Sequence, residues 1–117
     1  MVSENGSEAG LPIEEWDGEH LLKALGQENP PRIVDVRTEG EFAQGSLPGA
    51  VNVPLDELDR RKEEAAPDAG RELVAVCSDG ERSAVAVMIL RSLGVPHVKM
   101  LHGGLRSVGI ETDPEVE

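Results

Sequence analysis

The sequence is poor in aromatic residues, with one tryptophan, one phenylalanine and no tyrosine among its 117 residues. A core must therefore be built from aliphatic side chains, and the chain is long enough for one such core. Its single cysteine, Cys77, excludes an internal disulfide and a multi-cysteine zinc site. The three histidines are scattered without metal-ligand spacing, so no metal site is expected.

Positive charge is also scarce. Eleven lysines and arginines stand against 23 acidic residues, which gives a formal net charge of −12. Nucleic acids and anionic membranes are bound through clustered cations, so neither is an expected partner. The one basic run, residues 60–62, is flanked by acidic residues, which is typical of a solvated helix face.

Long hydrophobic runs are missing. No stretch approaches the roughly 20 apolar residues that cross a bilayer, and residues 1–10 have neither the basic nor the apolar region of a signal peptide. We therefore expect a cytoplasmic protein whose thiol stays reduced. The polar residues 1–10 predict a disordered tail, residues 11–111 one domain, and residues 112–117 an acidic tail.

Short apolar runs alternate with helical patterns along this domain. Strands are predicted at residues 32–36, 50–53, 72–76 and 97–101, and helices at 17–26, 39–43, 55–65 and 82–93. Continuous apolar strands between helices are typical of a parallel sheet that is covered on both faces. The predicted fold class is α/β, with a mostly parallel central sheet of about five strands and helices on both faces.

The segment around Cys77 is the strongest candidate for a functional site. Cys77 ends the predicted central strand, where open α/β sheets place their ligands. The turn that follows leads into a helix, so its backbone N–H groups can converge on an anion. Arg82 adds a positive charge and Ser83 a hydroxyl, a setting that favours the reactive thiolate. A buried core cysteine followed by a simple helix-entry turn is the alternative.

Three motifs resemble those of the rhodanese-like sulfurtransferases. The loop Cys77-x-x-x-x-Arg82-Ser83 resembles their active-site loop. The upstream signature of that family is similar to Asp35-Val36-Arg37-x-x-x-Glu41-Phe42-x-x-Gly45-x-Leu47-Pro48-Gly49-Ala50-x-Asn52-x-Pro54, and its closing motif to Leu101-x-Gly103-Gly104. The likeness runs from about Ile13 to Ile110. Ser46 departs from it, because family members usually carry a histidine there.

The resemblance implies a single rhodanese-like domain and a covalent mechanism. The Cys77 thiolate would take sulfur from a small donor, such as thiosulfate or a persulfide, and pass it from a Cys77 persulfide to a thiol or protein acceptor. The implied persulfide-binding loop consists of Ser78, Asp79, Gly80, Glu81, Arg82 and Ser83, whose amides would stabilise the anion. Asp35 and Arg37 are expected to hold neighbouring loops together. No metal or organic cofactor is implied.

Two other functions remain open at this point. A non-catalytic rhodanese-like binding module is one, although the presence of Cys77 and Arg82 argues against it. A phosphatase or arsenate reductase is the other. The related phosphatase loops have five residues between cysteine and arginine, whereas this chain has four, from Ser78 to Glu81, and the tighter ring favours a single sulfur atom.

The loop is also unusually acidic. Asp79 and Glu81 leave it with a net negative charge even when Arg82 is counted. A negative rim repels anions, so thiosulfate, which is a dianion, is not the favoured donor.

Overall fold

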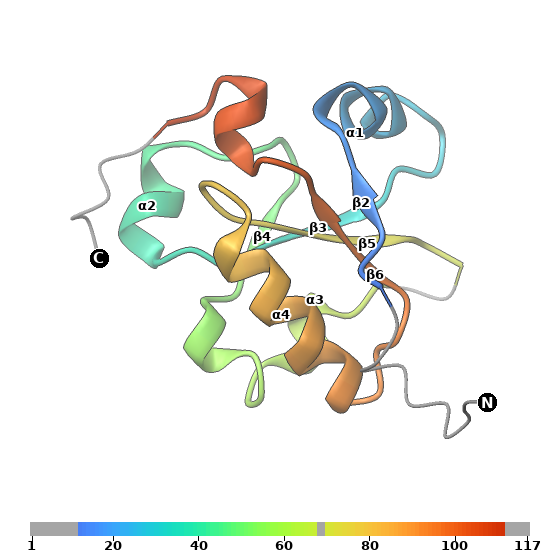
Figure 1. The fold of residues 1–117 in the computed structure, drawn as a ribbon, viewed down its shortest axis with the longest axis vertical. Coiled ribbons are helices and arrows are strands. Elements are labelled where there is room, and N and C mark those ends of the chain that lie inside the picture. Colours follow the sequence, from blue (N-terminus) through green and yellow to red (C-terminus); the bar gives the residue numbers. More distant parts are fainter. Residues whose placement is uncertain (1–11, 68–69, 112–117) are drawn as a thin grey trace.

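The computed structural model describes residues 12–67 and 70–111, so both predicted tails lie outside the described residues. Figure 1 shows the order of the elements along the chain. They are β2 (Glu15–Trp16), α1 (Gly18–Leu25), β3 (Arg32–Asp35), α2 (Glu39–Gln44), β4 (Val51–Asn52), the 3-10 helix η2 (Leu55–Glu57), α3 (Lys62–Ala65), β5 (Leu73–Val76), α4 (Glu81–Ser92), β6 (Val98–Leu101) and the 3-10 helix η3 (Leu105–Val108). Within this part of the chain, no helix is both long and apolar enough to cross a bilayer.

The five strands form one parallel sheet in the order β2-β6-β5-β3-β4. The central strand β5 pairs with β3 through Asp35 and Val76, and with β6 through Leu73 and Val98. The predicted α/β class and five-stranded sheet are confirmed. Because all strands run the same way, their carboxyl ends lie at one end of the sheet. Cys77 follows the central strand and lies in the middle of that end.

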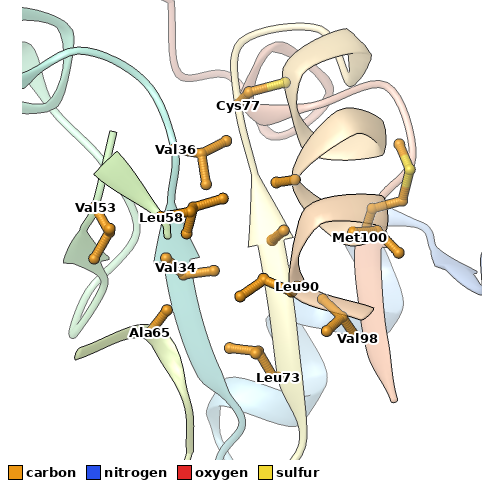
Figure 2. Packing of buried hydrophobic residues seen from close by; sticks show 13 residues of the cluster. Val34, Val36, Val53, Leu58, Ala65, Leu73, Cys77, Leu90, Val98 and Met100 are labelled. Atoms are coloured by element: carbon orange, nitrogen blue, oxygen red, sulfur yellow. The ribbon is translucent and has the colours of Figure 1, made fainter. Parts of the chain in front are cut away.

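Both faces of the sheet are covered, as predicted. Along β5 the side chains alternate between two buried clusters: Leu73, Ala75 and Cys77 belong to the first, and Val74 and Val76 to the second. Residues of α3 and α4 complete the first cluster, whereas residues of α1 and η3 complete the second. Figure 2 shows the first cluster, in which side chains of β5 and α4 meet beneath Cys77.

Two elements differ from the sequence-based prediction. The edge strand β2 was not predicted, because a two-residue strand leaves no apolar pattern; it forms because the amides of Met100 and His102 donate to the carbonyls of Glu14 and Trp16. The single helix predicted over 55–65 was wrong. The chain instead forms η2 and α3, separated by residues 58–61, of which Arg61 has φ −118° and ψ 27°.

Arg61, the last residue of that break, is held by several contacts. Its guanidinium donates to the Asn52 carbonyl at 3.2 Å while it also pairs with Glu57 and Glu64, both at 2.7 Å. These bonds tie the segment to the end of β4.

Candidate active site

Cys77 lies directly after β5, and its sulfur accepts three hydrogen bonds from the start of α4. The donors are the Gly80 amide at 3.1 Å, the Ser83 amide at 3.3 Å and the Ser83 hydroxyl at 3.0 Å. Figure 2 shows the sulfur pointing toward the beginning of that helix. The side chain is fully buried. An anionic sulfur is the species that such converging donors stabilise best, and the positive end of α4 adds to the effect.

Two glycines allow the backbone to close around the sulfur. Gly80 has φ +106°, a conformation that L side chains rarely adopt, and it turns the chain from the loop into α4. Gly104 has φ +69°, and a Cβ atom there would overlap the backbone of Ser78. This close approach lets the amides of Leu105 and Arg106 donate to the carbonyls of Cys77 and Ser78 at 2.7 and 3.1 Å. The closing motif therefore holds the loop through its backbone.

The arginine of the loop is paired with a buried carboxylate. Nη1 and Nη2 of Arg82 donate to the two carboxylate oxygens of Glu41 at 2.7 and 2.9 Å. Nη2 also donates to the Ser78 hydroxyl at 3.2 Å, which in turn donates to Glu41 at 3.3 Å. The side chain of Glu41 is only 3% exposed, whereas that of Arg82 is 35% exposed. One carboxylate thus ties α2 to both ends of the loop.

The contacts of Glu41 set the protonation of the pair. The guanidinium of Arg82, helped by the Thr38 amide, lowers the pKa of Glu41 from 4.5 to about 2. Reciprocally, the hydrogen bonds to Glu41 raise the pKa of Arg82. The pair is therefore fully charged at neutral pH.

Sequence reasoning placed Glu41 in a family motif but gave it no role in the site. The available signal was Thr38-x-x-Glu41, the spacing of a helix capping box, and the structure contains that box. That spacing indicates only the helix cap, and nothing in the sequence indicates the second contact of Glu41, with Arg82 in a distant part of the chain.

The two acidic residues of the loop lie at its rim. Both Asp79 and Glu81 are exposed, and Oδ1 of Asp79 accepts a hydrogen bond from the Glu81 amide at 3.1 Å. That bond turns the Asp79 carboxylate back onto the first turn of α4. Ser78 is partly buried between the rim and Glu41.

Asp35 and Arg37 form a fully buried ion pair at 2.7 Å, at the end of β3 next to the loop strand. Arg37 also donates to the Gly45 carbonyl at 2.7 Å, and the Ser46 hydroxyl donates to Asp35 at 2.6 Å. The side-chain amide of Asn52 donates to the backbone carbonyls of both charged residues at 3.0 Å. This network attaches the chain after α2 to β3 and β4, and Ser46 supplies a bond to Asp35 although the family usually has histidine there.

A hollow of about 350 Å³ borders Arg82 between α4 and η2. Its lining is mostly apolar and consists of Val36, Thr38, Pro54, Leu55, Asp56, Arg82, Val85 and Ile89. Two larger hollows, of about 530 and 660 Å³, border α1 and include no residue of the loop. The hollow beside Arg82 is therefore the one that adjoins the candidate site.

The sequence and the fold both match known proteins. The sequence model of the rhodanese-like domain matches residues 18–110. A sulfurtransferase of Allochromatium vinosum is 34% identical over 93 residues, covering 80% of this chain and 85% of the relative. The thiosulfate sulfurtransferase PspE of Escherichia coli is 34% identical over 77 residues, covering 66% and 73%.

Solved structures show the same fold. The crystal structure of SSP1007 from Staphylococcus saprophyticus superposes with a TM-score of 0.74 at 30% identity, covering 90% of this chain and 99% of the other. The human single-domain sulfurtransferase TSTD1 gives a TM-score of 0.70 at 28% identity, with 89% and 100% covered.

Proposed function

We propose, because the chain belongs to the rhodanese-like domain family, that it is a sulfurtransferase which carries sulfane sulfur as a persulfide on Cys77. The observation that carries the proposal is the set of three donors within 3.3 Å of the Cys77 sulfur. A thiol that only filled the core would not need these donors, because an uncharged thiol accepts hydrogen bonds weakly.

The reaction has two displacement steps. In the first, the Cys77 thiolate attacks the outer sulfur of the donor, the S–S bond of the donor breaks, and the leaving group takes the bonding electron pair. Thiosulfate would leave as sulfite. In the second, a thiolate or another nucleophile attacks the terminal sulfur of the persulfide and Cys77 leaves as a thiolate. Neither step needs a metal or an organic cofactor, because the sulfur only changes partners.

Access to Cys77 requires movement at the rim, since its side chain is fully buried. The partly exposed Arg82 side chain lies between the loop and the neighbouring hollow. We place the body of the donor or acceptor in this hollow, with its reactive sulfur directed toward the loop. Gly80 and Ser83 would then hold the negative charge as it passes between donor and enzyme.

Mass spectrometry of the intact protein tests the proposal. The chain is incubated with thiosulfate or with an organic persulfide, freed from excess donor and weighed. We expect a gain of one sulfur atom, which cyanide removes as thiocyanate. Because Cys77 is the only cysteine, Cys77→Ser is a complete control and should gain nothing. An unchanged mass with every donor would refute the persulfide mechanism.

A further inference from the structure

The charges around the Cys77 loop influence which sulfur donors can approach it. The one cation of the loop, Arg82, is held by both oxygens of the Glu41 carboxylate. Its charge is therefore balanced inside the protein before a donor arrives. This leaves the rim residues Asp79 and Glu81 to set the local charge that an incoming anion meets.

Other cations near the rim do not reverse this balance. The backbone amide of Arg106 donates to the Ser78 carbonyl and the residue is exposed, so its charge is counted together with those of the loop. With Arg106 counted, two guanidiniums stand against the three carboxylates of Glu41, Asp79 and Glu81. The thiolate that must attack adds another negative charge. A dianion therefore approaches a site of its own sign, inside a chain of net charge −12.

We propose that Cys77 takes its sulfur from a donor with no more than one negative charge, such as an organic persulfide or a thiosulfonate. Asp79 and Glu81 are the specificity-determining residues that act against the thiosulfate dianion. This inference rests on the proposed sulfurtransferase function and names the class of donor for the same site.

Two donors that react through the same kind of S–S bond but differ in charge show whether the charge of the donor sets its rate. Thiosulfate carries two negative charges, and attack on its outer sulfur gives the Cys77 persulfide and sulfite. Methanethiosulfonate carries one, and the same attack gives the same persulfide and methanesulfinate. In both cases one S–S bond forms, one S–S bond breaks, and the leaving group takes the electron pair, so the total charge is unchanged.

The experiment measures kcat/KM, the second-order rate constant for persulfide formation, for each donor at about 0.01 M and 0.15 M salt. Over this range the screening length falls from about 30 to 8 Å. We expect kcat/KM to rise with salt for both donors, and more steeply for thiosulfate. In Asp79→Asn/Glu81→Gln at low salt, kcat/KM should rise roughly tenfold for thiosulfate and threefold for methanethiosulfonate, because the repulsion scales with the charge of the donor.

A matched variant separates the rim from the overall charge. Glu19→Gln/Glu63→Gln removes the same two charges from exposed positions on α1 and α3. It should leave the ratio of the two kcat/KM values near that of the parent. In the rim variant, the side-chain oxygen at position 79 can still accept from the backbone amide at position 81, so the loop geometry is retained.

The possible outcomes distinguish this inference from the proposed function. If both donors load Cys77 but thiosulfate is preferred and its rate falls as salt is added, the donor class is wrong and the sulfurtransferase function stands. Equal effects of the two double variants would also overturn the role of Asp79 and Glu81. If neither donor loads Cys77, the proposed function itself fails.

Discussion

The pair formed by Glu41 and Arg82 gives the sharpest test of how the loop is held. In Glu41→Gln the side chain keeps its size, and its amide oxygen can still accept from the Thr38 amide, so the helix cap is retained. What is lost is the charge that holds Arg82 through two hydrogen bonds. We expect this change to destabilise the protein at neutral pH and to leave the loop arginine without its charged partner.

The magnitude follows from the pKa of Glu41. A pKa that drops from 4.5 in the unfolded chain to about 2 in the folded one corresponds to about 3 kcal/mol of stability. Because Arg82 is 35% exposed, solvent screening reduces this contribution to about 2 kcal/mol. A lowered folded-state pKa stabilises the protein fully above about pH 4.5, and the contribution disappears as the pH falls toward 2. At pH 3 less than half of the difference between parent and variant should remain.

Urea denaturation of parent and variant at pH 7 and pH 3 measures this difference. Glu39→Gln is the matched control, since Glu39 is an exposed residue in the first turn of the same helix, and it should change the free energy of unfolding by less than about 0.5 kcal/mol. The reasoning would be refuted by a Glu41→Gln variant as stable as Glu39→Gln at pH 7. A deficit of the same size at both pH values would show that shape, not charge, accounts for the loss.

Two further substitutions and one assay of the parent chain test the loop. Ser83→Ala removes the hydroxyl donor 3.0 Å from the Cys77 sulfur and should slow sulfur loading about tenfold, measured by mass spectrometry over time; an unchanged rate would mean that the hydroxyl does not stabilise the anion. Gly104→Ala should lower the free energy of unfolding in urea by about 2–4 kcal/mol, because its Cβ would overlap the Ser78 backbone. Gly109→Ala is the control, with φ +87° but open space around it, and should lower it by about 1 kcal/mol. Equal losses would contradict the close approach at Gly104. Hydrolysis of aryl phosphates should be negligible because the loop has four residues between cysteine and arginine, and rapid release of phosphate by the parent chain would overturn the argument from loop length.

Much of the fold could be predicted from the sequence because it depends on neighbours within a few residues. The apolar runs that became β3, β5 and β6 are short and bounded by proline, glycine or charge, and the Asp17 side chain caps α1 at the start of the helix predicted over 17–26. The loop around Cys77 could also be recognised, since its cysteine, glycine, arginine and serine lie within seven consecutive residues. Features of this kind can be recognised in the sequence because the residues that form them are close together along the chain.

Contacts between residues far apart in the sequence emerged only in the folded chain. Edge strand β2 exists because β6 offers it a free side, and Arg61, at the break in the segment 55–65, contacts Asn52. Most important for the site, Glu41 meets Arg82 across 41 positions. No pattern of spacing records such a contact, because it arises only when the sheet brings the ends of β3 and β5 together. The local sequence therefore places the Cys77 sulfur at the start of α4, and the fold decides which charges surround it.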